Sequence, residues 1–415
     1  METFQIVTQY IFCFVALYIE VFFLINAFGG RKEIKAGTVI PDGIDWPAVT
    51  IVVPCWNEED TVVDTITSLL EIDYPEDKLH IIAVDDGSTD ETWARMQQFK
   101  GKNNIEIFTK ENGGKHTAMN LAIKMCKTEF VGCLDADAFI AYETLKKTMY
   151  QFIADPQIMA VSPTIIVHNP KGFLQKAQDI EYNMFILNKK VLAMLNGLHV
   201  TQGPFSMYRT RVFTELGPYR KAHNTEDLEI AYRMQAHGYK IGQCHDAYVY
   251  TVTPDTVKTL YKQRLRWVYG FLNNSFDYRK YIMRPKYGTF SVFSIPIGFV
   301  SIFGTLFTAF FLLWSVGVWM YHGIERLIVT NFHMAHVTTH FGDPFYFDTR
   351  PISLVSLFLF LVFLIMAVVG QRMAGKKSTS AYSFVVYVII FSIISPFWFF
   401  RAVYNSLVTR EMSWR

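Results

Sequence analysis

The chain has 415 residues, of which 51% are hydrophobic and 16% aromatic, and its formal net charge is only +2. This near-balance of charge excludes the strongly basic footprint of a nucleic-acid-binding protein. The length allows one globular domain with a large core and further segments beside it. The five cysteines show no paired spacing, so we expect reduced thiols and no zinc site.

The hydrophobic residues gather in four segments, each close to or above the roughly 20 residues that a helix needs to cross a bilayer. These segments are residues 4–28, 290–321, 352–370 and 382–404. Residues 45–285, between the first two segments, have the mixed composition of a soluble domain. The sequence therefore predicts an integral protein of a plasma or inner membrane with one large aqueous domain.

The charges beside the spans predict an orientation. Arg31, Lys32 and Lys35 follow the first span, whereas only Glu2 carries charge before it. The positive-inside rule then places the aqueous domain in the cytoplasm and the N-terminus outside. Three basic residues after the third span agree with this orientation: Arg372, Lys376 and Lys377. Three others near the C-terminus do not fit it, so the side on which the C-terminus lies stays open: Arg401, Arg410 and Arg415.

The first span is expected to be a retained anchor. It lacks the basic leader and the small-residue cleavage site of a signal peptide. Glu20 lies within it, where a carboxylate is costly. Two interpretations stay open, a functional carboxylate or a side chain that reaches the cytoplasmic interface.

Short β-branched runs alternate with helical periodicity in the first half of the aqueous domain. The runs are residues 49–54, 80–84, 105–108 and 130–134, and each ends in a polar cluster. Such alternation predicts a mainly parallel sheet with flanking helices. Ligands of such sheets bind beyond the carboxyl ends of the strands, so we expect the four clusters to meet there.

Each polar cluster has a plausible chemical task, although each alone is also compatible with a solvated turn. Asp135 and Asp137 are separated by one residue and could bind a hard cation such as Mg²⁺ or Mn²⁺. Asn57 or Asp85 could bind a nucleobase by hydrogen bonding. Lys115 follows two glycines that would let the backbone approach a phosphate. Together they favour a nucleoside-diphosphate conjugate held through a metal.

Beyond residue 156 the pattern is less regular. The stretch 202–208 is a Gly/Pro turn with aromatic residues, which is either a loop that contacts an acceptor or a structural bend. Thr225, Glu226 and Asp227 have the pattern of a helix N-cap with acids in the first turn. Their place near other carboxylates also makes a general base with a raised pKa possible.

The segment from Thr256 to Tyr281 is basic and aromatic and lies just before the second span. Its periodicity predicts an interfacial helix on the lipid headgroups. The stretch from Gln263 to Trp267 could instead present a guanidinium to phosphate and an indole face to a sugar ring. Different faces of one helix can serve both purposes.

In this order, and with a Gln-x-x-Arg-Trp element, the motifs of residues 48–285 resemble the processive family-two membrane glycosyltransferases. These are the synthases of poly-β-1,6-N-acetylglucosamine, chitin, chitooligosaccharide, hyaluronan and cellulose. The resemblance implies a GT-A type α/β fold, with a mixed, mainly parallel sheet, attached to an α-helical transmembrane region. It divides the chain into an anchor (1–29), a transferase domain (30–255), interfacial helices (256–288) and a C-terminal membrane region (289–415).

The resemblance also implies roles for single residues. Asp227 matches the catalytic base, with Glu226 beside it, and Asp135 and Asp137 match the metal-binding pair. The implied donor-binding residues are Pro54, Asn57, Glu58, Asp85, Asp86, Lys115, Asp135, Gln263, Arg264 and Arg266. The implied acceptor-binding residues are Trp267, Gly203, Phe205 and Ser206.

The implied activity is the polymerisation of a β-linked polysaccharide from a UDP-sugar by inverting displacement. Thr-Glu-Asp followed by Gln-Arg-Leu-Arg-Trp, with one span before the domain and three after, favours UDP-N-acetylglucosamine. Expected partners are a growing glycan or lipid-linked acceptor, the lipid bilayer, and a homo-oligomer or secretion partner. The alternatives are transfer of a single sugar to a polyprenyl phosphate or lipid, and a transporter or scaffold with an inactive transferase domain.

One motif lies outside this interpretation. His333, His336, His340 and Asp343 lie in the loop between the second and third spans, at spacings that could bind a metal. Because the spacing matches no defined site, a solvated or headgroup-facing loop is favoured.

Overall fold

A computed structural model describes residues 2–330, 351–376 and 381–408. The histidine motif at His333, His336 and His340, like Arg410, lies outside the described residues. The chain divides into two units, Met1–Leu24 with Ile297–Ile365 and Ile25–Pro296 with Met366–Arg415. Among the residues that the structure describes, four helices are long and apolar enough to cross a membrane, which confirms the four predicted segments: Ile6–Gly29, Phe290–Val329, Pro351–Met373 and Tyr382–Leu407.

The first unit contains most of three apolar helices, α1 (Glu2–Gly29), α11 (Ile295–Val329) and α12 (Pro351–Met373). Phe12 of α1 packs against Phe307 of α11 with ring centroids 4.5 Å apart. Gly304 lies on the same face, where an added Cβ would approach the Phe12 ring to 3.3 Å. A small residue at this position lets the two helices pack closely.

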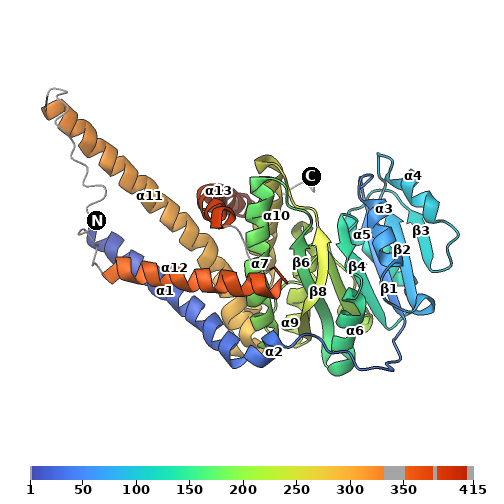
Figure 1. The fold of residues 1–415 in the computed structure, drawn as a ribbon. Coiled ribbons are helices and arrows are strands. Elements are labelled where there is room, and N and C mark those ends of the chain that lie inside the picture. Colours follow the sequence, from blue (N-terminus) through green and yellow to red (C-terminus); the bar gives the residue numbers. More distant parts are fainter. Residues whose placement is uncertain (1, 331–350, 377–380, 409–415) are drawn as a thin grey trace. The chain divides into compact units, whose positions relative to one another are not determined.

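The second unit is built on one eight-stranded sheet with the order β3-β2-β1-β4-β7-β6-β8-β5 (Figure 1). The strands are β1 (Val49–Cys55), β2 (Leu79–Asp85), β3 (Ile105–Thr109), β4 (Phe130–Leu134), β5 (Ala138–Ile140), β6 (Ile158–Val167), β7 (Phe205–Arg209) and β8 (Lys240–Thr251). The strands β1 to β4 are mutually parallel, as are β6 and β8, whereas β7 runs antiparallel to both β4 and β6. The predicted mixed, mainly parallel sheet is therefore confirmed.

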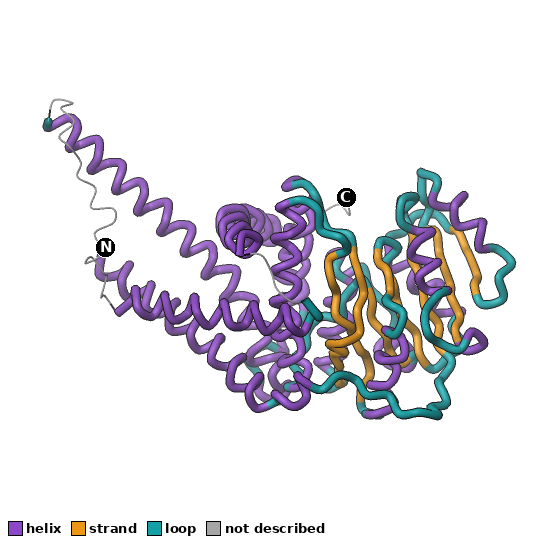
Figure 2. The backbone as a smooth tube through the Cα atoms, in the orientation of Figure 1, coloured by secondary structure: helices purple, strands orange, loops and turns teal. Residues whose placement is uncertain are grey.

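Helices lie on both faces of this sheet, as the purple and orange segments of Figure 2 show. On one face α3 (Val62–Leu70), α4 (Thr92–Met96) and α6 (Thr144–Ala154) share an apolar core with alternate residues of β1. Elsewhere α5 (Lys115–Met125) packs on β1 and β2. Because β1 is central, all seven of its residues are buried, which explains its uninterrupted apolar run.

The α-helices of this unit that are not yet described lie either before the first strand or after the strands β6, β7 and β8 along the chain. They are α2 (Arg31–Lys35), α7 (Phe173–Met194), α8 (Arg211–Leu216), α9 (Glu226–Ala236), α10 (Val257–Asp277) and α13 (Ala381–Leu407). The long apolar helix α13 packs against both α7 and α10. The amphipathic helix predicted over residues 256–281 is thus α10, capped by Thr256, whose hydroxyl accepts the Thr259 N–H at 3.2 Å.

Candidate active site

The polar clusters predicted from the sequence meet at the carboxyl edge of the parallel strands. Asp85 is the last residue of β2 and lies in register with Cys55, the last residue of β1. Asp135 follows β4 directly, and β4 is the other parallel neighbour of β1. This arrangement explains why four separate stretches of sequence end in polar residues.

Four predicted residues converge around Gly203. The Lys115 ammonium lies 2.6 Å from Asp135 Oδ1 and 3.0 Å from Glu226 Oε1. The Gly203 N–H donates to Asp227 Oδ2 at 3.1 Å. An added Cβ at Gly203 would lie 3.2 Å from Asp227 Oδ2, 3.4 Å from Asp135 Oδ2 and 3.5 Å from Lys115 Nζ. The glycine therefore lies at the centre of this charged cluster, where a larger residue would disturb it.

The loop before α5 positions Lys115. Gly114 has a φ of 90°, which a residue with a side chain rarely adopts. The buried Asp86 carboxylate accepts the N–H groups of Gly113 at 3.1 Å and Gly114 at 2.8 Å, and it pairs with Lys110 at 2.5 Å. Asp86 was predicted to bind the donor; in this structure its carboxylate organises the loop, and the donor contact stays a prediction.

The residues predicted to bind the nucleoside line the ends of β1 and β2. Asp85 is 2% exposed and accepts hydrogen bonds from the Thr109 hydroxyl at 2.8 Å and the Ser88 N–H at 3.2 Å. Asn57 has a left-handed backbone, with a φ of 54°, and accepts the Thr89 N–H at 2.8 Å. The Glu58 N–H donates to the Thr92 hydroxyl at 2.7 Å, and Pro54 is buried in β1. The structure thus holds these residues in fixed positions beside one another.

The pKa values of the two neighbouring acids, Glu226 and Asp227, shift in opposite directions. Burial, and then the negative charge of Glu226, raise the pKa of Asp227 to about 6. Burial also acts to raise the pKa of Glu226, but the Lys115 ammonium, a backbone hydrogen bond and the Arg266 charge together outweigh it, and the net shift of the pKa is downward. The pKa of Lys115 is raised because Asp135 and Glu226 outweigh the effect of burial. Such a divergence between adjacent acids is typical of sites that transfer protons.

The pair Asp135 and Asp137 suits a divalent cation. Burial, and then the charge of Asp135, raise the pKa of Asp137 to about 7, and burial also raises the pKa of Asp135. Within residues 2–330, 351–376 and 381–408, no side-chain donor bonds the Asp137 carboxylate, and no group of three or more potential metal ligands occurs. Two crowded oxygen ligands therefore fit a cation that takes its remaining ligands from a bound phosphate or water.

The Gln-Arg-Leu-Arg-Trp stretch lies on α10, and its two arginines differ. Arg266 Nη1 lies 3.5 Å from the Asn224 carbonyl, and its guanidinium acts to lower the pKa of Asp227 and Glu226. Arg264 is buried and pairs with Glu181 of α7 at 2.5 Å. Its guanidinium lies 4.4 Å from the centroid of Trp267, which is half-buried. Arg266 therefore acts on the cluster, whereas Arg264, predicted to bind the donor, supports Trp267.

Three other predicted residues are partly or fully buried. Gln263 is partly buried, and its Oε1 has no hydrogen-bond partner among the described residues. Phe205 is fully buried in the main core. The Ser206 hydroxyl bonds to the Ser162 hydroxyl at 2.8 Å and donates to the Gln202 carbonyl at 3.0 Å. Phe205 and Ser206 thus support the loop that carries Gly203, and their contact with an acceptor stays a prediction.

Sequence reasoning missed a lysine that supports the same loop. Burial lowers the pKa of Lys189, on α7, to about 8, opposed by the charges of Glu181 and Asp227. With the Gln202 amide oriented to satisfy both of its groups, its oxygen accepts from Lys189 and its nitrogen donates to the Pro163 carbonyl at 2.7 Å. A lysine within a helix gives no signal of burial in a single sequence, because lysine is usually exposed.

The fold and this cluster define a glycosyltransferase domain of the GT-A type, and comparison with known families agrees. The model of the family described as "Glycosyltransferase like family 2" matches residues 47–270. Because the match covers more than half of the chain, the chain belongs to this family. The matched region holds every residue assigned to the site.

Two curated relatives are similar over this region. The poly-beta-1,6-N-acetyl-D-glucosamine synthases of Staphylococcus aureus (strain MSSA476) and Staphylococcus epidermidis are each 30% identical over 224 residues, 54% of this chain and 54% of theirs. The chain thus matches about half the length of these relatives. A solved mannosyltransferase from Pyrobaculum calidifontis, in complex with GDP-Man and Mn²⁺, has a TM-score of 0.59 at 17% identity and covers 97% of this chain and 100% of its own. That likeness concerns the fold.

Proposed function

We propose that this protein is a membrane-embedded inverting glycosyltransferase that polymerises β-linked N-acetylglucosamine from UDP-N-acetylglucosamine. The observation that carries the proposal is the convergence of Asp227, Asp135 and Lys115 around Gly203. The poly-N-acetylglucosamine synthases that match residues of the same domain support the choice of sugar and of polymer.

Asp227 acts as the general base. Its Oδ1 accepts the Leu228 N–H at 2.9 Å and its Oδ2 accepts the Gly203 N–H at 3.1 Å, so both oxygens are oriented and each keeps a lone pair. The carboxylate takes the proton of an acceptor hydroxyl while that oxygen attacks the anomeric carbon. UDP leaves from the opposite face of the sugar, which inverts the anomeric configuration. A positioned base contributes typically 10² to 10⁴ in rate.

The cations of the site balance the charge of the donor diphosphate. Lys115 is held by Asp135 and Glu226 and remains protonated, because its pKa is raised. Arg266 supplies a second, fixed positive charge beside the same acids. A divalent cation such as Mg²⁺ or Mn²⁺, bound by Asp135 and Asp137, would supply Lewis-acid stabilisation of the departing diphosphate. These positive charges stabilise the negative charge that develops on the departing UDP, in a site that contains little water.

The nucleoside and the acceptor bind on opposite sides of this charge cluster. Pro54, Asn57, Glu58 and Asp85, fixed at the ends of β1 and β2, hold the uridine. Trp267, held against Arg264, offers an aromatic face to the acceptor sugar. The proposed orientation, with the aqueous domain in the cytoplasm, is supported by the basic residues after the first span.

The test is a screen of UDP-sugars against the purified full chain in lipid nanodiscs with Mn²⁺ or Mg²⁺. UDP release and product mass are measured together. We expect UDP release with UDP-N-acetylglucosamine and a ladder of products spaced by one N-acetylglucosamine unit. A single sugar on a lipid acceptor would contradict polymerisation. Absence of UDP release with every donor would contradict the transferase and favour an inactive domain on a transporter or scaffold.

A further inference from the structure

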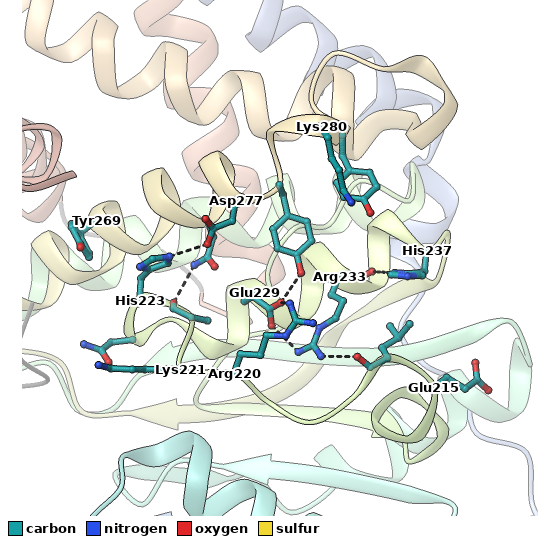
Figure 3. Close-up of a pocket in the computed structure, with 16 residues that line it drawn as sticks. Glu215, Arg220, Lys221, His223, Glu229, Arg233, His237, Tyr269, Asp277 and Lys280 are labelled. Carbon is teal, nitrogen blue, oxygen red and sulfur yellow. Dashed lines mark hydrogen bonds and ion pairs between the residues drawn. The ribbon is translucent and has the colours of Figure 1, made fainter. Parts of the chain in front are cut away.

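A second polar cavity lies on a different face of α9 from Asp227. Its volume is about 670 Å³, and Glu229, Arg233 and His237, at four-residue spacing, form its α9 wall (Figure 3). Its other walls come from residues 220–224 and from residues 274–281 at the end of α10. None of the residues assigned above to donor, metal, base or acceptor lines it. The cavity therefore has no role in the transfer reaction as proposed.

The acidic groups of the cavity already have partners. The Glu229 carboxylate accepts from Arg233 at 2.7 Å, from the Tyr278 hydroxyl at 2.5 Å and from Arg220 at 3.3 Å. The Asp277 carboxylate lies 3.0 Å from His223 Nε2. The Glu215 carboxylate accepts from the Tyr239 hydroxyl. The acidic side chains that line the cavity are therefore already engaged by contacts within the protein.

Two cations of the cavity retain unused donors. The Arg220 side chain is 61% exposed, and its one contact to an acid among the described residues is the 3.3 Å contact with Glu229, which Arg233 already neutralises. The Lys280 ammonium lies 4.9 Å from the centre of the Tyr281 ring and meets no carboxylate within the described parts of the chain. A guanidinium carries five N–H donors and an ammonium three. The cavity therefore offers an excess of positively charged donors.

Two buried atoms of the lining also lack a partner among the described residues. They are Arg233 Nε and Asn274 Oδ1, on side chains that are 3% and 1% exposed. Buried polar atoms are normally hydrogen-bonded, so each of these two lining side chains has capacity for a further polar partner. A ligand with hydroxyl groups beside its charged group would supply both an acceptor for Arg233 and a donor for Asn274.

We propose that this cavity is a second ligand site, which binds a phosphate-bearing molecule through Arg220 and Lys280. The volume lies within the roughly 300 to 1,000 Å³ of small-molecule sites. Arginine and lysine side chains are both suitable donors to phosphate oxygens. The same chemistry is offered by a soluble nucleotide or by a phospholipid headgroup, which can approach because Lys280 precedes the apolar helix that starts at Phe290.

Occupancy of the cavity stabilises the segment that leads to Asp227. Ala222, His223 and Asn224 form one wall and have φ values of 45°, 55° and 62°, three consecutive left-handed residues. Such conformations persist only where surrounding contacts hold them. Here Asn274 Nδ2 donates to the Ala222 carbonyl at 3.2 Å, and Asp277 contacts His223. A ligand fastened to this wall would add contacts directly before Thr225 and α9.

The test compares the wild type with Arg220→Gln, Lys280→Gln and the double variant. The purified full chain, in phosphatidylcholine nanodiscs without divalent cations, is titrated calorimetrically with inorganic pyrophosphate. Lys286→Gln is the matched control, because Lys286 is an exposed lysine of the same basic segment that does not line the cavity. We expect the double variant to lose at least about tenfold in affinity and the control to be unchanged.

A separate readout distinguishes this site from the donor site. Binding of UDP in the presence of Mn²⁺ should be the same in the double variant and in the wild type. Pyrophosphate affinity that is unchanged in the double variant, or a parallel loss of Mn²⁺-dependent UDP binding, would overturn the proposal. Because UDP binding is measured independently, failure of the proposed transferase activity would not be mistaken for failure of the second site.

Two further measurements show whether the phosphate comes from a lipid or a soluble molecule, and whether its binding stabilises the segment before Asp227. If phosphatidate added to the nanodiscs competes with pyrophosphate, a lipid headgroup reaches the site; if it does not, the natural ligand is soluble. Amide hydrogen exchange of residues 219–226 should slow when pyrophosphate binds and should not respond in the double variant. Exchange that slows equally in both proteins would overturn the coupling.

Discussion

At the scale of single residues, Asp227 is the group whose removal should separate chemistry from binding. Asp227→Asn keeps the size and shape of the side chain and can retain one of the two hydrogen bonds that Gly203 and Leu228 donate to separate carboxylate oxygens, but it cannot accept the proton. We expect transfer to fall by about 10² to 10⁴ while UDP binding persists. Turnover and equilibrium binding of UDP measure the two effects. Loss of UDP binding in this variant would mean that Asp227 holds the donor.

The neighbouring Glu226 should tune the pH dependence. Asp227 works in its ionised form, so the rate should fall as the pH decreases through its pKa of about 6. Glu226 contributes to that raised value through its negative charge. In Glu226→Gln the pKa of Asp227 should therefore fall, and the acid limb of the pH–rate profile should move to lower pH.

The profile is measured at saturating donor and metal, with Glu106→Gln as the control because Glu106 is exposed on the edge strand β3. A shift of the acid limb to higher pH, or an equal shift in the control, would contradict the proposed pair. Reduced turnover without any shift of the acid limb would show that Glu226 acts by holding Lys115, and not through its charge on Asp227.

At the scale of secondary-structure elements, an ion pair between Glu181 of α7 and Arg264 of α10 supports the side chain of Trp267. Glu181 and Arg264 have side chains only 10% and 8% exposed, so neither charge is solvated if its partner is removed. We expect Glu181→Leu or Arg264→Met alone to destabilise the fold by about 3 to 5 kcal/mol. The double variant should be less destabilised than either single variant, because no unpaired charge remains. Thermal unfolding of the solubilised chain measures the three.

If the destabilisation of the double variant equalled the sum of the two single effects, a direct interaction between Glu181 and Arg264 would be contradicted. The same experiment bears on the predicted donor contact of Arg264. If the double variant retains UDP affinity, this arginine acts through packing on Trp267 and not through the diphosphate.

The sequence predicted the first four strands because each is a short apolar run between clear turn signals. It did not resolve β6, β7 and β8. In β6 the run contains Pro163, which normally excludes a central strand, but the structure places it at a register shift between β6 and β8. In β8, His245 and Asp246 interrupt the apolar pattern.

The site could be predicted where function demands unusual residues in short motifs, as at Asp135 and Asp227. It could not be predicted where tertiary packing decides the environment. Elements distant in sequence bury Arg264 and Ser206 and partly bury Lys189, and a polar residue gives no local signal of such an environment. The separate roles of Arg264 and Arg266, two residues apart on one helix, follow only from what packs beside each.

At the scale of the whole molecule, the proposed orientation can be tested with single cysteines. Lys102 lies on an exposed turn before β3, and Val329 ends α11 and is 78% exposed. If the aqueous domain is cytoplasmic, Val329→Cys should react with a membrane-impermeant maleimide on intact cells and Lys102→Cys only after permeabilisation. The wild-type chain, with its native cysteines, is the control. The reverse pattern would place the aqueous domain outside.

The stack at Arg264 has a consequence for the order in which the protein is made. The guanidinium lies between Trp267 and Phe391, at 4.4 Å and 5.7 Å from the two ring centroids, and Phe391 belongs to the last apolar helix. At about 5 to 20 residues per second, the ribosome reaches this helix several seconds after α10. The packing around Trp267 is therefore completed only when this helix has been synthesised and has packed, so a chain cut short before it would carry its acidic cluster but would lack part of the support for Trp267, the proposed acceptor platform.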